Sequence, residues 1–245
     1  MSLRGISISR VDERRTVTTA AAKSETGIAL VIVLLAMMLI AALGMALSLT
    51  TSTETRIAAS YAWSAEAFYA ADAAIERAVH DLAGVGDWTN ALDGAAMSFS
   101  DGPPGPRTMP DGTRVDLNAI TDRLNCGHLS CSAAELTAVN ADRPWGINNP
   151  TWRLYAHGPL TMLGSSIDVD PPIYVIVWVS DDPLENDGQP SIDGDETIAP
   201  NPGRGILQVR AQAHGAGGSQ RGIEMTLRRA ATRVHVLSWR EMRQD

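Results

Sequence analysis

An unbroken apolar run from Gly27 to Leu49 dominates the pattern of hydrophobic and polar positions along the chain. No charged residue lies between Ile28 and Leu49. About 20 apolar residues are enough to cross the hydrocarbon core of a bilayer as one helix, and a helix pairs all of its own backbone polar groups. The run therefore predicts a single membrane-spanning helix.

The helical pattern continues beyond the apolar run, because no proline or glycine occurs between Leu49 and Gly84. Alanines, among them Ala70, Ala71 and Ala74, favour a helix and permit close packing. Six larger apolar residues recur at spacings of four, seven, seven, four and three, which is a helical period. We expect one helix over residues 28–84 whose apolar stripe covers a sheet and packs against neighbouring subunits. The stripe consists of Ile57, Tyr61, Phe68, Ile75, Val79 and Leu82.

The residues before the apolar run, 1–27, form a polar leader without apolar periodicity, which is typical of a disordered segment. Its basic residues hold this end in the cytoplasm by the positive-inside tendency, so the chain beyond Leu49 is expected outside the inner face of the membrane. A cleaved signal peptide is the alternative, with Gly44-Met45-Ala46 as a small-x-small cleavage site. The basic residues are Arg4, Arg10, Arg14, Arg15 and Lys23.

After Gly84 the pattern changes to short β-strands separated by turns, over a domain of residues 85–245. Most of these strands alternate apolar and polar positions, which places one face on a core and the other in water. Residues 173–179 are apolar on both faces, as in a central strand. The expected fold is α+β, with the long helix laid on a four- to five-stranded antiparallel sheet. The strand candidates are 97–99, 115–120, 152–157, 173–179, 207–213, 223–227 and, as a fifth sheet strand, 233–239.

Cys126 and Cys131 flank a histidine, His128. On the outer side of a membrane such a pair favours a disulfide, which contributes about 2 kcal/mol or less because the closed loop is short. Two thiolates and one imidazole without a fourth ligand nearby are a weak zinc pattern. Directly afterwards, Ser132 and Glu135 have the spacing of a capping box and predict a short helix through residue 139.

An acidic loop, 181–205, separates the central strand from the next one. So many carboxylates repel one another unless they are solvated or bound to a cation, and calcium takes about six to eight such oxygens. The spacing does not fit the EF-hand pattern. A solvated loop and a calcium site both remain open, the latter with Asp181, Asp182, Glu185, Asp187, Asp193 and Asp195 as ligands.

Charge and motif content narrow the function classes. The formal net charge of −8 argues against a nucleic-acid partner, which would need a basic face. The five histidines are scattered, and no nucleophile-elbow, phosphate-loop or zinc-protease motif occurs. We therefore expect a protein that is not an enzyme.

The order of these segments resembles that of type IV pilins and type II secretion pseudopilins: a leader ending in glycine, an uncharged stretch, an amphipathic helix and a β-rich domain. The resemblance implies cleavage by prepilin peptidase between Gly27 and Ile28. The glutamate usual at the fifth mature position is replaced by Ile32, as in PilX-type minor pilins and GspK-type minor pseudopilins. Residues 67–82 are also similar to a PilX-type stretch, and GspK-type pseudopilins carry calcium sites.

The resemblance implies a minor pilin that primes or stabilises a type IV pilus, at or near its tip. Its expected partners are other minor and major pilins, prepilin peptidase and the inner membrane, which it crosses once before assembly into the pilus. A GspK-type pseudopilin is one alternative. A generic single-span membrane-anchored binding module is another.

Overall fold

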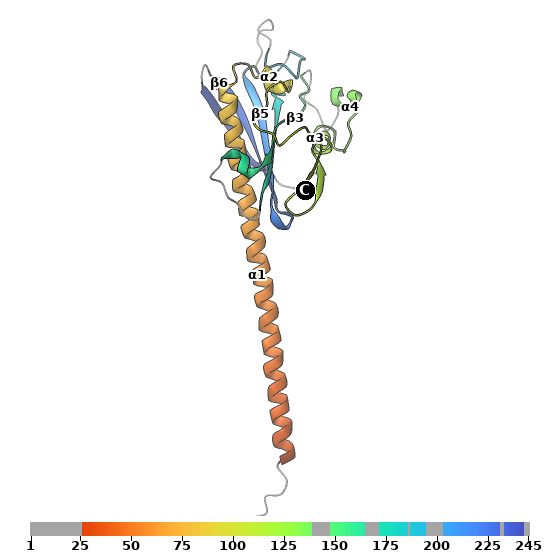
Figure 1. Cartoon of the computed structure of the whole chain (residues 1–245), viewed down its shortest axis with the longest axis vertical. Helices are drawn as coiled ribbons and strands as arrows, with labels where there is room; N and C mark the ends of the chain where they lie inside the picture. Colours follow the sequence, from red (N-terminus) through yellow and green to blue (C-terminus); the bar gives the residue numbers. More distant parts are fainter. Residues whose placement is uncertain are drawn as a thin grey trace, which may run out of the picture. The chain divides into compact units, whose positions relative to one another are not determined.

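One long helix and one five-stranded antiparallel sheet make up most of this α+β fold (Figure 1). The computed structural model describes residues 26–138, 148–164, 172–185, 187–194, 203–230 and 233–242. The chain forms two compact units that divide between Glu54 and Thr55. Its helices are α1 (Thr26–Gly84), α2 (Thr89–Leu92), α3 (Leu117–Cys126) and α4 (Ala133–Thr137), with short 3-10 turns at Leu160–Leu163 and Ala216–Gly218. Its strands are β1 (Pro106–Thr108), β2 (Arg114–Asp116), β3 (Arg153–Pro159), β4 (Tyr174–Asp181), β5 (Ile206–His214), β6 (Gln220–Ala230) and β7 (Arg233–Met242).

In the first unit, α1 exposes every side chain from Gly27 to Glu54. Its apolar residues form a continuous exposed surface of a size that soluble monomers rarely show. Just after the apolar run, threonine hydroxyl groups bond to backbone carbonyls of the same helix. Thr50 and Thr51 each donate a hydrogen bond of 3.0 Å to the carbonyl four residues earlier. These bonds satisfy the hydroxyls within the helix itself, as a segment near an apolar medium requires.

The five-stranded sheet is a meander in which β3, β4, β5, β6 and β7 pair in sequence order, each antiparallel to the next. β4 is buried along its whole length, as the apolar run at 173–179 predicts for a central strand. β5 alternates half-buried and buried positions, so its apolar residues face one layer and its polar residues the other. The expected fifth strand at 233–239 is confirmed as β7.

The second unit buries one face of α1 against this sheet, and the face is built mainly from alanine. Ile75 and Leu82 add larger side chains, and both are fully buried with the valines of β4. The prediction that Ile57 and Tyr61 belong to this buried stripe is wrong, because they are 64% and 78% exposed. The small alanine side chains let the helix lie close to the sheet. A helical period shows only that residues share one face of the helix, and it does not show how far along the helix the sheet covers that face. The buried alanines are Ala67, Ala70, Ala71, Ala74 and Ala78.

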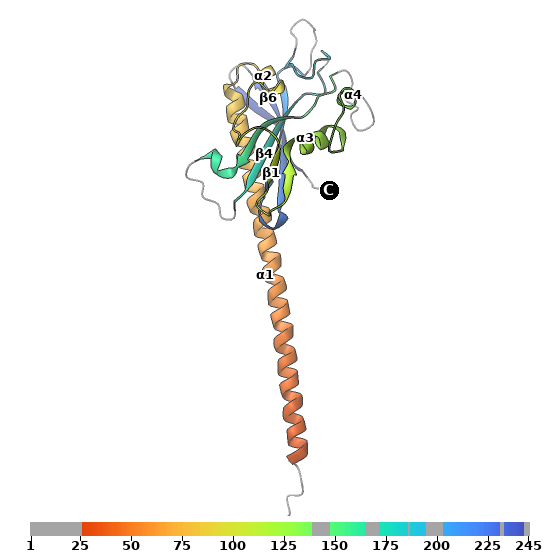
Figure 2. The same ribbon diagram turned by 45° about the vertical axis from the view of Figure 1, so that its right-hand side comes forward.

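A second, smaller core lies on the opposite face of β4. Ile176 and Trp178 point into it and meet Leu117 at the start of α3, so α1 and α3 cover opposite sides of the sheet (Figure 2). The strand expected at 115–120 ends at Asp116, where the prediction fails. The Asp116 carboxylate accepts a hydrogen bond of 2.9 Å from the backbone of Asn118 and caps α3, which starts the helix at the next residue.

The structure tests three further local predictions between residues 97 and 138. No strand forms at 97–99, where the chain instead donates a backbone hydrogen bond of 3.0 Å from Ser98 to the carbonyl of Tyr155. Cys126 and Cys131 are joined in a disulfide, so neither sulfur is a thiolate for zinc. The capping box of Ser132 and Glu135 is present at the start of α4. The helix ends at Thr137, and residue 139 lies outside the described residues.

Candidate functional site

The apolar part of α1 is the first candidate site. Within the described part of the chain, one helix is long and apolar enough to cross a membrane, and its most apolar stretch is fully exposed. Gly27 and Ile28 lie at its start, and Ile32 is 60% exposed in the same apolar surface. A signal sequence would meet the same criteria of length and composition. The helix fits a membrane anchor.

A second exposed surface lies in the domain itself. Phe68 on α1 packs edge-on against Tyr69, with ring centroids 5.5 Å apart, and against Trp239 of β7, at 6.2 Å. Tyr61 and Phe68 also line one shallow hollow with Tyr69. Tyr61, Tyr69 and Trp239 are exposed, and Phe68 is half-buried among them. We call these four residues the aromatic patch. Tyrosine and tryptophan at a solvent-exposed surface are typical of protein interfaces.

Arg221 fixes the helix beside this aromatic patch to the sheet. Its Nε donates a hydrogen bond of 2.7 Å to the hydroxyl of Ser64 on α1. Another of its nitrogens lies 3.1 Å from a carboxylate oxygen of Glu241 on β7. A single side chain on β6 therefore ties together the helix and the edge strand that carry the aromatic patch. The patch is thus presented by rigid elements rather than by a loop.

The acidic loop contains a compact carboxylate cluster. One oxygen each of Asp181, Glu185 and Asp193 lie within 4.8 Å of one another. Asp181 ends β4, and the backbone of Glu185 donates a hydrogen bond of 3.1 Å to the carbonyl of Asp182, which turns the chain back. A Cβ at Gly203 would lie 2.6 Å from the backbone nitrogen of Glu185, so glycine permits this close approach.

The electrostatics of the cluster are unfavourable for unpaired charge. Burial raises the pKa of Asp181, and the charge of Glu185 raises it further. Burial also raises the pKa of Asp182 and of Asp193. Hydrogen bonds oppose these shifts: Asn148 donates to Asp181 at 2.7 Å, and the backbone of Gly205 donates to Asp193 at 2.8 Å. A bound cation would stabilise the charged forms of the same carboxylates.

The expected calcium ligands thus separate into groups. The structure brings Asp181, Glu185 and Asp193 together. Asp182 lies beside them, but its carboxylate accepts a hydrogen bond of 3.1 Å from the backbone of Leu184. Asp187 caps a turn elsewhere by accepting a hydrogen bond of 2.8 Å from the backbone of Gln189. Asp195 lies outside the described residues.

A polar cluster that the sequence did not indicate joins Ser100, Asp101 and His157. The Nε2 atom of His157 lies 3.2 Å from the Ser100 hydroxyl, and its Nδ1 atom lies 2.9 Å from Asp101. This is the order of a Ser-His-Asp triad. The His157 side chain has no exposed surface, however, and the Ser100 hydroxyl donates to the carbonyl of Gly102. The geometry supports a structural role in which the loop after α2 is fastened to β3.

Comparison with known families gives one match. Residues 26–76 match the family model described as PilX N-terminal. No curated protein and no solved structure matches the chain significantly. The matched segment holds the apolar run and, with Tyr61, Phe68 and Tyr69, most of the aromatic patch. Together with the long apolar helix and the antiparallel sheet, the match supports a type IV pilin-like protein, a structural class rather than an enzymatic one.

Proposed function

We propose that this chain is a minor pilin that primes or stabilises the assembly of a type IV pilus, at or near its tip. The observation that carries the proposal is an exposed apolar helix with Ile32 at the fifth position after the Gly27–Ile28 junction. In this proposal prepilin peptidase removes residues 1–27. Residues 28–84 form the membrane and assembly helix, and residues 85–245 form the outer domain. The subunit crosses the inner membrane once and then moves into the pilus.

The physical basis of assembly is an exchange of apolar surroundings. In the membrane, lipid covers the apolar side chains from Ile28 to Leu49. In a filament, the same side chains pack against the corresponding helices of neighbouring subunits, so little apolar surface is exposed to water at either stage. Ile57 and Tyr61, on the same helix beyond the charge-free run, are exposed, as a contact between subunits requires. The partners are therefore other minor and major pilins.

The isoleucine at position 32 sets the place of the subunit. In the type IV pilins that this chain resembles, a glutamate at this position is the partner for the N-terminal amine of an adjoining subunit. A carboxylate in an apolar medium is costly unless it is paired. Ile32 removes both that cost and the attraction, so this subunit does not recruit the amine of the next one. We infer low incorporation along the shaft and a role in an initiating complex.

The acidic cluster favours one alternative within the same superfamily, a GspK-type minor pseudopilin of a type II secretion system. Asp181, Glu185 and Asp193 supply three carboxylates at a spacing that fits one calcium ion. Both proposals assign the same role to the helix, but one places the subunit in a type IV pilus and the other in a type II secretion system. The subunits that co-purify with the protein distinguish the two. A generic membrane-anchored binding module lacks the cleavage at Gly27 altogether.

A substitution at the fifth position tests the proposal. Ile32→Glu, compared with the conservative Ile32→Leu, is introduced into cells that assemble the pilus. We expect Ile32→Leu to behave as the wild type, and Ile32→Glu to be misplaced into the shaft or to fail to start filaments. If the Ile32→Glu protein assembled in the same position and amount as the wild type, the tip proposal would be wrong.

A further inference from the structure

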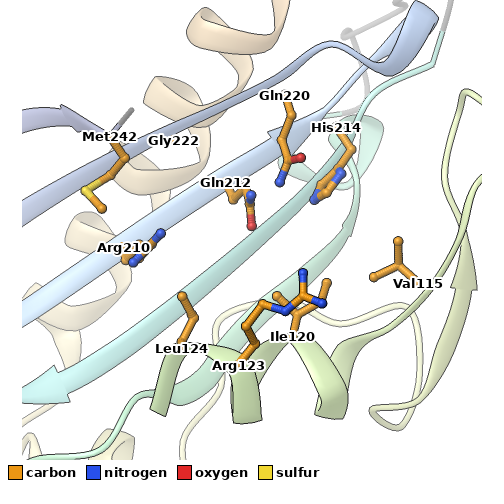
Figure 3. Close-up of a pocket in the computed structure, with 10 residues that line it drawn as sticks. All are labelled: Val115, Ile120, Arg123, Leu124, Arg210, Gln212, His214, Gln220, Gly222 and Met242. Carbon is orange, nitrogen blue, oxygen red and sulfur yellow. The ribbon is translucent and has the colours of Figure 1, made fainter. Parts of the chain in front are cut away.

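A cavity of about 550 Å³ lies on the face of the sheet that points away from α1 (Figure 3). On this face α3 covers the apolar residues of β4, namely Tyr174, Ile176 and Trp178. The neighbouring strand β5 presents polar residues on the same face, in register with them: Trp178 pairs with Arg210, and Ile176 with Gln212. Over β5 the floor is therefore polar and half-buried. The cavity forms where the apolar covering by α3 gives way to this polar row.

A glycine keeps the floor of the cavity open. Gly222 on β6 stands opposite Gln212 on β5 and opposite Met242 on β7. A Cβ at Gly222 would lie 3.4 Å from the Cβ of Met242, whose side chain lines the cavity. Any larger side chain at this position would reduce the volume available to a ligand. The cavity therefore depends on the glycine at position 222 and not only on the space between α3 and the sheet.

The polar groups of the cavity are unusually cationic for an acidic chain. Arg123 reaches it from α3 and Arg210 from β5, on facing sides in Figure 3. Within the part of the chain that the structure describes, neither guanidinium makes a hydrogen bond or a salt bridge. Glu224, which stands opposite Arg210 in register, accepts a hydrogen bond of 3.0 Å from Arg240. Burial lowers the pKa of Arg210, and the charge of Glu224 opposes that shift without a hydrogen bond between the two side chains. Two arginines thus remain available to a ligand.

Neutral hydrogen-bonding groups complete the lining. The carboxamides of Gln212 and Gln220 face the cavity and make no side-chain hydrogen bond among the described residues. His214 lies beside them, and its Nε2 atom is buried without a hydrogen bond to any described group. Burial lowers the pKa of His214 to about 4, while the charge of Asp111 opposes the shift, so the ring is neutral at pH 7. A buried polar atom without a partner is costly, and this atom becomes available to a ligand only if the neighbouring side chains shift.

We propose that this cavity binds a small organic ligand that carries a carboxylate together with hydroxyl groups, of which an acidic monosaccharide is the simplest example. Its volume lies within the range of about 300–1,000 Å³ that is usual for small-molecule pockets. Arginine forks match the geometry of a carboxylate. The carboxamides of Gln212 and Gln220 can both donate to and accept from hydroxyls, so they would add contacts to a ligand that carries hydroxyl groups beside its carboxylate. Ile120 and Leu124 on α3 provide an apolar wall for the ring carbons.

This inference does not rest on the pilin proposal and is tested separately. The full chain in detergent micelles is titrated with glucuronate, with glucose as the matched neutral sugar and with inorganic phosphate, and binding is followed by saturation-transfer NMR. We expect glucuronate to receive saturation and to bind at least about tenfold more tightly than glucose, since a charge-assisted pair contributes roughly 1.5–3 kcal/mol. Phosphate should bind more weakly than glucuronate.

Three variants localise the binding. Arg123→Gln and Arg210→Gln should each weaken glucuronate binding about tenfold. Arg153→Gln, at an exposed arginine on β3 outside the cavity, should leave it unchanged. Arg123 is itself exposed on α3, so its replacement tests the site even if Arg210→Gln fails to fold. The proposal is overturned if glucuronate receives no saturation, if glucose or phosphate binds equally well, or if Arg153→Gln has the same effect as Arg123→Gln.

Discussion

The side-chain amide of Asn148 donates a hydrogen bond of 2.7 Å to a carboxylate oxygen of Asp181, from a position 33 residues earlier in the chain. Both side chains are fully buried. The same amide also donates to the backbone carbonyl of Asp182 at 2.9 Å. Asn148 therefore holds the end of β4 in the conformation that places Asp181 beside Glu185 and Asp193, where three carboxylates share one small volume.

Calcium should stabilise the protein through this cluster. A ligand that binds only the native state at about 100 times its Kd adds about 2.7 kcal/mol to the free energy of unfolding. We expect millimolar calcium to raise the thermal midpoint of the full chain in micelles by several degrees. Asp181→Asn should abolish the increase, whereas Asp187→Asn, at a half-buried position outside the cluster, should retain it. An unchanged midpoint in the wild-type protein would leave only a solvated acidic loop.

The same cluster sets a pH dependence in the presence of a chelator. Burial raises the pKa of Asp181 above its ordinary value of 3.8, so the folded protein keeps a proton that the unfolded chain releases. The protonated carboxyl contributes its full stability at pH values below the unfolded pKa of 3.8. That contribution is lost as the pH rises towards the higher pKa of the folded protein. The Asp181→Asn variant should therefore gain on the wild type in thermal midpoint between about pH 5 and pH 8. A difference that stayed constant over this range would contradict the raised pKa.

The alanine face of α1 should tolerate no enlargement. Ala74 is fully buried against the sheet, whereas its neighbour Ala73 is exposed on the same helix. Ala74→Leu should lower the free energy of unfolding by about 1–3 kcal/mol, because extra methyl groups force a packed core apart. Ala73→Leu should change it by no more than about 0.5 kcal/mol. Urea unfolding measures both, and equal effects would show that the helix does not pack closely on the sheet.

The aromatic patch should serve assembly and not folding. Tyr61 and Tyr69 are 78% and 68% exposed, so Tyr61→Ala and Tyr69→Ala should leave the thermal midpoint nearly unchanged. We expect both variants to recover fewer partner pilins in detergent pull-downs. Glu66→Ala, at an exposed position of the same helix, provides the matched control. Unimpaired recovery by both tyrosine variants would remove the patch from the assembly surface.

Processing of the leader separates a pilin from a signal-peptide protein. If prepilin peptidase cleaves after Gly27, the mature protein begins at Ile28, and Gly27→Leu keeps the leader attached. Gly44→Leu, which alters the alternative signal-peptidase site, should leave the mature N-terminus at Ile28. Mass spectrometry of the purified protein reads the N-terminus directly. A wild-type protein that began at Leu47 would support the signal-peptide alternative instead.

Periodic patterns predicted the elements of the fold but not their partners. The long helix follows from a helical period, most of the sheet strands follow from alternating periods, and β4 follows from a short apolar run, and all three patterns depend on local geometry alone. The same period could not show that Ile57 and Tyr61 are exposed, because that depends on where the sheet lies along the helix. At 115–120 the alternation suggested a strand, but the capping carboxylate of Asp116 starts a helix.

The candidate sites show the same division. Composition indicated the acidic loop, and the structure selects three of its carboxylates. The role of Asn148 has no local signal, since it depends on a contact between distant segments. The cavity beside β5 was equally hidden. Arg210 and Gln212 appear in the sequence only as the polar half of an alternating strand, which an ordinary solvated face would also explain.

The position and number of this subunit in assembled pili test the account most directly. Purified filaments are analysed by quantitative mass spectrometry, and a tag on the outer domain is located by gold labelling. We predict a few copies per filament, with label at or near one end, because Ile32 gives no carboxylate to recruit the next subunit. A copy number approaching that of the major pilin, with label along the whole shaft, would contradict the account.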